Sequence, residues 1–334
     1  MRIYNDRPRL NITSKTAPQM FLDELKFYRN NNQHHVTLFG KRIINIYKSI
    51  NIQVIVTEKN DASFGFDDVS RIEIDTSHLL ADVLYQYNRQ GIIPTVTTSG
   101  GEPGIYPKWV NNNIKVVQSH EVLRYNLNTN GKNLEKITPY GLVNLLRYHY
   151  NPETNASIFN RKSIMKLPTT TAPLTMQCYL VSGGIDSPKE IKKYMDFFMT
   201  EGRGAHGFIF RGMPNQDSDK ECLTTPPEYS KDNSVDFFDI LAQVVIDNDF
   251  EFVEQKIGDH YIYEIYRYKG VFARFSYSDY SLLRKIETEE RNKGDWFSRT
   301  TIIRPDGKVY AGWAYDLNLI YDSQAKGTNS YNIY

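Results

Sequence analysis

The chain has little cysteine: only two residues, Cys178 and Cys222, in 334. They lie far apart in the sequence, and two thiols cannot supply a four-thiolate zinc site, a three-thiolate cluster site or a disulfide framework. A reducing, cytoplasmic setting is therefore the expectation.

Long apolar runs are also missing. A membrane-spanning helix needs roughly 20 apolar residues, whereas the longest run, 237–246, is interrupted by Asp239 and Gln243. The first eight residues lack the uninterrupted apolar stretch of a secretory signal. We therefore expect no membrane partner.

Charge of one sign is not in excess. Lys and Arg number 40 against 39 for Asp and Glu, so the formal net charge is +1. Such a chain has no overall field to attract nucleic acid, and no nucleic acid partner is indicated. The phosphate-binding loop Gly-x-x-x-x-Gly-Lys-Ser/Thr, a serine elbow and a His-Glu-x-x-His helix are absent from the sequence as well.

Short apolar runs alternate with helical patterns in the middle of the chain. The expected strands are 52–56, 93–97, 122–126, 142–146, 174–181 and 207–210. The expected helices are 77–90, 105–112, 152–160 and 187–201. Because strands joined by helical crossovers pair in parallel, this alternation predicts an α/β fold in which residues 48–213 form a partial barrel.

Two further segments flank this barrel. Residues 1–47 contain an expected helix at 17–31 and a hairpin with Gly40 at its turn. Residues 214–334 begin with a polar stretch that marks a boundary, followed by one expected helix at 235–247 and then strand-rich sequence. These strands are 251–256, 261–268, 271–277, 300–303 and 308–313. We expect this segment to be an α+β C-terminal extension, with Pro305-Asp306-Gly307 turning its last hairpin.

Small and polar residues follow each expected barrel strand. In a parallel α/β sheet, ligands bind beyond the carboxyl ends of the strands. The segments at these ends include Thr57-Glu58-Lys59, Gly100-Gly101-Glu102-Pro103, Thr129-Asn130-Gly131, Arg147-Tyr148-His149-Tyr150, Ser182-Gly183-Gly184-Ile185-Asp186-Ser187 and Arg211-Gly212-Met213.

This ordered set resembles the radical S-adenosylmethionine superfamily. In that family the first strand ends in a Cys-x3-Cys-x2-Cys loop that holds a [4Fe-4S] cluster. The second ends in Gly-Gly-Glu-Pro, which meets the amino group of S-adenosylmethionine, and the third commonly ends in Thr-Asn-Gly. Here the second and third stand intact at 100–103 and 129–131. The resemblance spans about residues 36–213 and implies a partial (β/α)6 TIM-like barrel.

The first loop departs from the family. Alignment on Thr57-Glu58-Lys59 places Asn60, Phe64 and Asp67 where the three cysteines stand in the family. Iron–sulfur clusters are held by cysteine sulfur, occasionally with histidine substituted, so this set predicts that no [4Fe-4S] cluster is bound. Without the cluster, reductive cleavage of S-adenosylmethionine has no electron source.

The resemblance implies that the binding half of the site survives, with S-adenosylmethionine as the candidate cofactor. Two glycines before Glu102 permit close approach to a ligand, and a carboxylate can bind its ammonium group. The expected cofactor-binding residues are Gly100, Gly101, Glu102, Asn128, Ser182 and Arg211. Asn128 or Ser182 would contact ribose hydroxyls, and Arg211 a ligand carboxylate. The alternative is that the Glu102 loop is kept only for its backbone geometry.

Three functions remain open from the sequence. The leading one is a radical-SAM-like pseudoenzyme that binds a small nucleotide-like ligand, a protein partner, or both. The second is a non-radical enzyme acting on or with S-adenosylmethionine or a related nucleoside, with Glu102, His149 and Asp186 as acid–base groups. His149 and Asp186 also have simpler interpretations, as a hydrogen-bonded histidine at a strand end and a helix-start residue. The third is a structural module whose pocket is filled by Phe64 and tyrosines.

Overall fold

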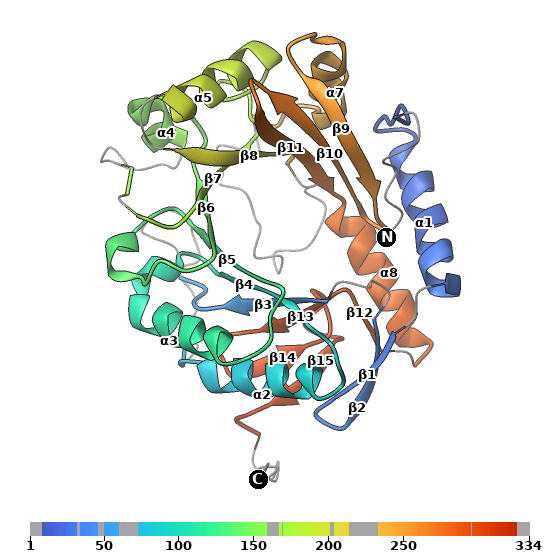
Figure 1. Cartoon of the computed structure of the whole chain (residues 1–334). Coiled ribbons are helices and arrows are strands. Elements are labelled where there is room, and N and C mark those ends of the chain that lie inside the picture. The colour runs from blue at the N-terminus through green and yellow to red at the C-terminus, as the bar shows by residue number, and fades with distance from the viewer. Residues whose placement is uncertain are drawn as a thin grey trace.

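A computed structural model describes residues 9–31, 34–45, 50–59, 73–158, 167–168, 170–200, 204–213, 233–294 and 296–325. Within these residues the chain is an α/β protein built on one 12-stranded, mostly parallel sheet, with a second sheet of three strands. Figure 1 shows the large sheet following an arc, with helices on its outer side.

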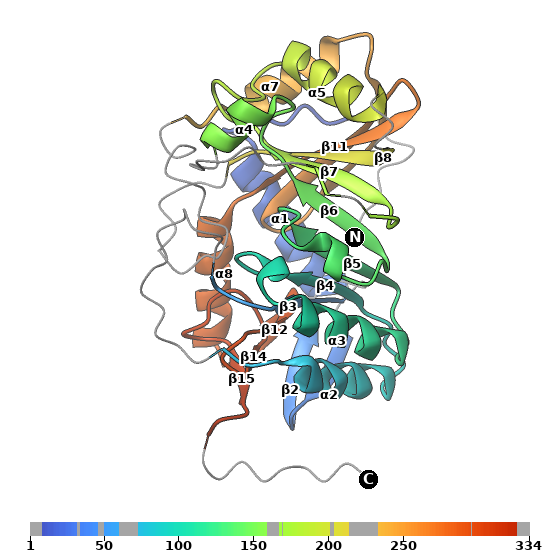
Figure 2. The same cartoon turned by 90° about the vertical axis from the view of Figure 1, so that its left-hand side faces the viewer.

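The centre of the large sheet confirms the expected alternation. Its strands run parallel in chain order: β3 (Asn51–Ile55), β4 (Thr95–Ser99), β5 (Arg124–Thr129), β6 (Leu142–Leu146), β7 (Leu174–Tyr179) and β8 (Ala205–Arg211). Figure 2 shows them side by side from bottom to top. The helices between them are α2 (Ser77–Asn88), α3 (Pro107–Gln118), α4 (Pro152–Ile158) and α5 (Pro188–Thr200). Short 3-10 turns, η1 (Pro103–Ile105) and η2 (Leu134–Lys136), follow β4 and β5.

Strands from beyond residue 250 extend both edges of this sheet. On one side β8 pairs in parallel with β11 (Val271–Ser278), followed by antiparallel β10 (Tyr261–Tyr268) and β9 (Glu251–Ile257). On the other side β3 pairs in parallel with β13 (Thr300–Ile303), followed by antiparallel β14 (Lys308–Tyr310) and β15 (Leu319–Asp322). The expected hairpin at 305–307 is confirmed, although its second strand ends at Tyr310 instead of Trp313.

The N-terminal helix and hairpin are confirmed. Helix α1 (Ala17–Asn31) precedes β1 (His34–Leu38) and β2 (Lys41–Asn45), which pair antiparallel. Phe39 and Gly40 between them both have positive φ, of 49° and 76°, as a tight hairpin turn requires. Strand β12 (Phe297–Ser298) adds to β2, and the expected C-terminal helix is α7 (Phe237–Ile246).

The structure adds a helix to the strand-rich segment after residue 247 that the sequence did not predict, α8 (Tyr280–Asn292). Asp279 caps the start of this helix, because its side chain accepts a hydrogen bond from the Leu282 backbone N–H at 2.9 Å. Its buried positions are Leu283, Ile286, Glu287 and Glu290. Since two of these four are glutamates, the apolar pattern is too short to predict a helix.

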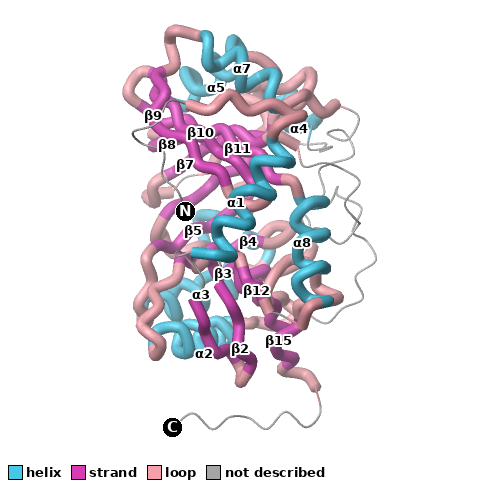
Figure 3. The backbone as a smooth tube through the Cα atoms, turned by 90° about the vertical axis from the view of Figure 1, so that its right-hand side faces the viewer, coloured by secondary structure: helices cyan, strands magenta, loops and turns pink. Residues whose placement is uncertain are grey.

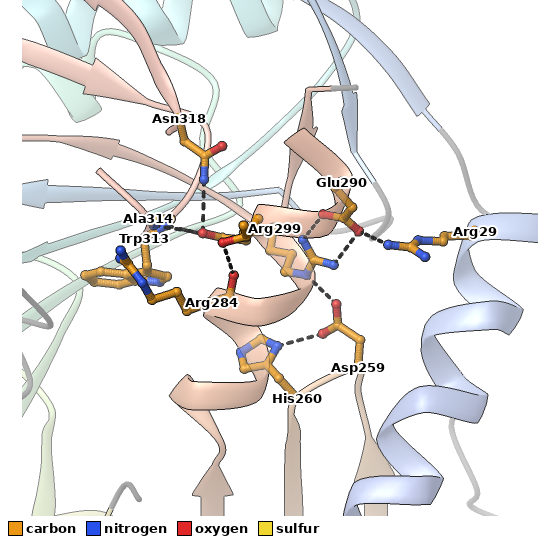
Figure 4. A network of polar contacts seen from close by, with 11 residues as sticks. Arg29, Asp259, His260, Arg284, Glu290, Arg299, Trp313, Ala314 and Asn318 are labelled. Carbon is orange, nitrogen blue, oxygen red and sulfur yellow. Dashed lines mark hydrogen bonds and ion pairs between the residues drawn. The ribbon is translucent and has the colours of Figure 1, made fainter. Parts of the chain in front are cut away.

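A buried ion network fixes α8 to the rest of the chain (Figure 4). Arg299 donates two hydrogen bonds to Glu290, at 2.8 and 2.9 Å, and a third to Asp259. Arg29 of α1 pairs with the same Glu290 at 2.7 Å. Three residues before Glu290 in α8, Glu287 accepts the Ala314 backbone N–H at 2.8 Å. Burial raises the pKa of this carboxyl. Figure 3 shows α1 and α8 lying along the same side of the molecule.

The large sheet has one apolar and one polar face. Alternating residues such as Val54, Val96 and Leu127 pack with α2 and α3, while Phe208, Phe210 and Phe275 pack with α5 and α7. The residues between them, which point to the inside of the arc, are mostly polar: Gln53, Thr97, Asn126, Asn128, Asn144, Thr175, Gln177, Arg211, Arg274 and Ser276. We call this the inner face. None of the described helices is long and apolar enough to cross a membrane.

Candidate functional site

The loops after β3 and β4 are joined through their backbones. Val56 N–H donates to Ser99 at 2.9 Å, Gly101 N–H to Thr57 at 2.8 Å, and Glu102 N–H to Lys59 at 3.0 Å. The pairing of the two strands thus continues past their ends, and the Gly100-Gly101-Glu102-Pro103 segment lies directly against Thr57-Glu58-Lys59.

Gly100 is required by this contact. Its φ of +150° is disfavoured for residues with a side chain, and a Cβ built there would lie 2.4 Å from the Thr57 carbonyl oxygen. The close approach that this glycine permits is therefore to the protein's own backbone.

We expect Gly100→Ala to lower the free energy of unfolding by about 2–4 kcal/mol, because the new methyl group adds a backbone clash to a strained φ. Gly91→Ala is the matched control, since Gly91 has a φ of +70° and nothing within 4 Å of a built Cβ. Gly91→Ala is expected to lower the free energy of unfolding by only about 1–2 kcal/mol. Urea unfolding of both variants measures the difference, and equal losses would contradict the close contact.

Glu102 joins the two motifs that carry the resemblance. Its side chain is 1% exposed and accepts hydrogen bonds from Thr129 Oγ1 at 2.6 Å, Asn130 N–H at 2.7 Å and Gly104 N–H at 2.8 Å. One oxygen caps η1, while both oxygens tie the loop after β4 to the loop after β5. The carboxylate thus holds these two loops together at the carboxyl edge of the sheet.

Glu73 and Arg304 organise the first loop, and sequence reasoning did not assign either a role. Glu73 accepts hydrogen bonds from Thr57 Oγ1 at 2.9 Å and Glu58 N–H at 2.8 Å, and it lies 3.4 Å from Lys59 Nζ. Glu58 forms a buried ion pair with Arg304, whose guanidinium lies 4.1 Å from the centre of the Tyr315 ring. Residues from the end of the chain therefore complete this edge.

His149 is half-buried after β6, in a ring-to-ring contact with Tyr150 at 4.2 Å. Its Nδ1 accepts the Asn151 N–H at 2.9 Å, so in this geometry the ring is neutral and carries its proton on Nε2. Burial lowers the pKa of His149, and the carboxylates of Glu190 and Asp186 oppose that shift. A neutral imidazole near two carboxylates is able to exchange protons at its Nε2.

Asp186 and Ser182 lie in the turn before α5. Asp186 accepts the Gly183 N–H at 3.1 Å, while the helix start itself is capped by Ser187, which accepts the Glu190 N–H at 3.4 Å. Ser182 is exposed, and its backbone N–H donates to the Asn233 carbonyl at 2.7 Å. The structure thus brings Asp186 within electrostatic range of His149.

Glu102 stands apart from that pair. It follows β4, whereas His149 follows β6, so two strand spacings of about 4.8 Å each separate the segments that carry them. The three acid–base residues expected from the sequence therefore divide into a His149–Asp186 pair and a separate Glu102.

Asn128 and Arg211 belong to the inner face. Asn128 accepts a hydrogen bond from the Asn144 side chain at 2.7 Å, and Gln53 donates to Ser99 Oγ at 2.6 Å. These amides and hydroxyls form a row across β3 to β6. Arg211 lies at the carboxyl end of β8, and its buried Nε has no hydrogen-bond partner among the residues that the structure describes. This face is therefore the part of the site with polar groups oriented away from the apolar core.

The thiol chemistry of the described residues does not fit an iron–sulfur cluster. Cys178 is buried on the helix-covered face of β7, and burial raises the pKa of its thiol well above the usual value. Its Sγ contacts the Tyr179 carbonyl at 3.2 Å. In the described part of the chain, no three His, Cys, Asp or Glu residues are grouped to hold a metal ion. Asn60, Phe64, Asp67 and Cys222 lie outside the described residues.

Comparison with known proteins identified no family for this chain. No family model matches it, and a search of curated proteins found no match. The residues at the carboxyl edge of the sheet and on its inner face are therefore the ones that indicate a function.

Proposed function

We propose that the chain is a radical-SAM-like protein without an iron–sulfur cluster, which binds S-adenosylmethionine or a related nucleotide at the carboxyl ends of β3 to β8. In this proposal the six parallel strands are the partial (β/α)6 barrel of that superfamily, and residues 214–334 are its α+β extension. The protein acts as a pseudoenzyme, through the bound ligand, a protein partner, or both.

The contact that carries the proposal is the one made by Glu102. Gly100-Gly101-Glu102-Pro103 and Thr129-Asn130-Gly131 each resemble a motif of the superfamily, and Glu102 accepts hydrogen bonds from both Thr129 and Asn130. Two chance matches would have no reason to adjoin each other at the ends of neighbouring parallel strands. The proposal excludes radical chemistry because Asn60, Phe64 and Asp67 are not cluster ligands.

Ligand contacts in this proposal are made by the inner face and by the turn before α5. Since Glu102 already accepts three protein hydrogen bonds, Asn128 and Ser182 are assigned to ribose hydroxyls and Arg211 to the carboxylate of the methionine moiety. An amide and a hydroxyl suit the sugar, and a guanidinium suits a carboxylate.

Calorimetry with S-adenosylmethionine and S-adenosylhomocysteine tests this assignment. Asn128→Ala is expected to weaken binding about five- to tenfold, as the loss of one or two ligand hydrogen bonds would. Asn112→Ala is the matched control, because Asn112 also makes one side-chain amide contact, to Asp75 at 2.6 Å, but on α3. It should leave binding unchanged. Absence of heat with both ligands would overturn the proposal, as would stoichiometric iron and sulfide in anaerobically purified protein.

The His149–Asp186 pair supports a second candidate, a non-radical enzyme using the same ligand. A neutral His149 near a carboxylate is suited to general acid–base work. Chromatography of S-adenosylmethionine after incubation with the protein separates the two. The pseudoenzyme returns the ligand unchanged, whereas an enzyme gives a new product that His149→Asn abolishes.

A further inference from the structure

Two arginines lie side by side on the inner face, on neighbouring strands. β8 and β11 pair in parallel, with Ser276 opposite Arg211 and Arg274 opposite Ile209. Residues in register share a face, and the phenylalanines between them, Phe210 and Phe275, pack into the core on the other face. Arg211, Arg274 and Ser276 therefore point to the inside of the arc together.

These groups lack the partners that buried polar groups normally have. The Nε atoms of Arg211 and Arg274 and the Ser276 hydroxyl are buried and have no hydrogen-bond partner in the described part of the chain. Within the described ranges, no carboxylate pairs with either guanidinium. Arg299 and Arg304 differ in this respect, because Arg299 pairs with Glu290 and Arg304 with Glu58.

The two positive charges act on each other. Burial, and after it the charge of Arg211, lowers the pKa of Arg274 to about 10. The contact that Arg274 does make is with the electron-rich face of Tyr263, whose ring centre lies 5.3 Å from its guanidinium. A ring stabilises a cation less than a carboxylate does, and no counter-charge for the two adjacent guanidinium groups lies among the residues that the structure describes.

We propose that Arg211 and Arg274, with Ser276, bind an oxyanion, the phosphate or carboxylate group of a small ligand. Guanidinium groups donate paired, parallel hydrogen bonds that match the oxygens of either group, and the Ser276 hydroxyl adds a neutral donor. The inference shares Arg211 with the proposed function and adds Arg274 and Ser276, but it requires neither S-adenosylmethionine nor the Glu102 loop. It assigns a negative charge to the ligand and a place for that charge on β8 and β11.

Inorganic phosphate and malonate are the two probes, each titrated by calorimetry and by thermal unfolding at constant ionic strength against chloride. We expect saturable binding that raises Tm. Arg274→Met and Arg211→Met should each weaken it at least about tenfold, as loss of a charged hydrogen bond does. Arg267→Met is the control, because Arg267 on β10 is already paired with Glu251 at 3.1 Å, and it should bind like the unmodified chain.

Thermal unfolding in chloride alone distinguishes this role from a structural one. Without an oxyanion, Arg274→Met should unfold at the same temperature as the unmodified chain or a higher one, because one of two repelling charges is gone. A structural role instead predicts a lower Tm and an undiminished response to the probes. A response to phosphate, malonate or both supports the site and identifies the source of its ligand. No response to either, or equal responses in all variants, overturns it, whatever calorimetry with S-adenosylmethionine shows.

Discussion

Glu102→Ala is expected to lower the free energy of unfolding by about 3–5 kcal/mol, measured by urea unfolding. The substitution removes a carboxylate that accepts hydrogen bonds from Thr129, Asn130 and Gly104, and it leaves these three donors without that acceptor in a buried place. A donor buried without a partner loses its hydration and gains nothing in exchange.

Two companion variants sharpen this prediction. Glu102→Gln keeps the shape but turns one acceptor oxygen into a donor, so we expect about half the loss. Glu135→Ala on η2 is the control, since Glu135 is exposed, and it should change stability by less than about 0.5 kcal/mol. If Glu102→Ala were as mild as the control, Glu102 would not be the junction between the two loops and would be available to a ligand.

Arg299→Met is expected to lower the free energy of unfolding by about 3–5 kcal/mol, because it removes the guanidinium that pairs with two buried carboxylates. Asp259 is 0% exposed and Glu290 is 2% exposed, and both bond to this guanidinium. Arg29 would remain beside Glu290, and His260 would remain 2.6 Å from Asp259.

The control for Arg299 is an exposed ion pair between β10 and β9. Arg267 and Glu251 are 42% and 66% exposed, and Arg267→Met should cost less than about 1 kcal/mol. Added salt should shrink that small effect and leave the Arg299 effect unchanged, because buried pairs are screened less. Urea unfolding at low and high salt checks both, and equal losses for the two variants would show that the α8 network does not stabilise the fold.

The central fold could be predicted because apolar residues recur at clear strand and helix periods in its elements. β6, β10 and β13 begin and end where the apolar runs do, and α1 spans the expected 17–31. β12, β15 and α8 could not be predicted. β12 has two residues, and α8 buries glutamates whose partners, such as Arg299, come from elsewhere in the chain.

The site was predictable in part. The expected strand ends indicated which segments meet at the carboxyl edge. They did not indicate that Glu102 forms its hydrogen bonds there with the protein itself. Sequence reasoning also missed Arg274 and Ser276, although a signal was present. From Ala273 to Ser278 apolar and polar residues alternate, which places Arg274 and Ser276 on one face. Only the pairing of β11 with β8 brings that face beside Arg211.

The position of β13 has a consequence for how the protein is made. One side of β3 is covered by β13, whose residues follow it by about 250 positions. At about 5–20 residues per second, a ribosome needs roughly 12–50 s to synthesise that interval. During this time the nascent chain presents an unpaired strand edge, the kind of surface on which chains aggregate. Efficient folding in a cell should therefore depend on a chaperone that shields β3 during translation.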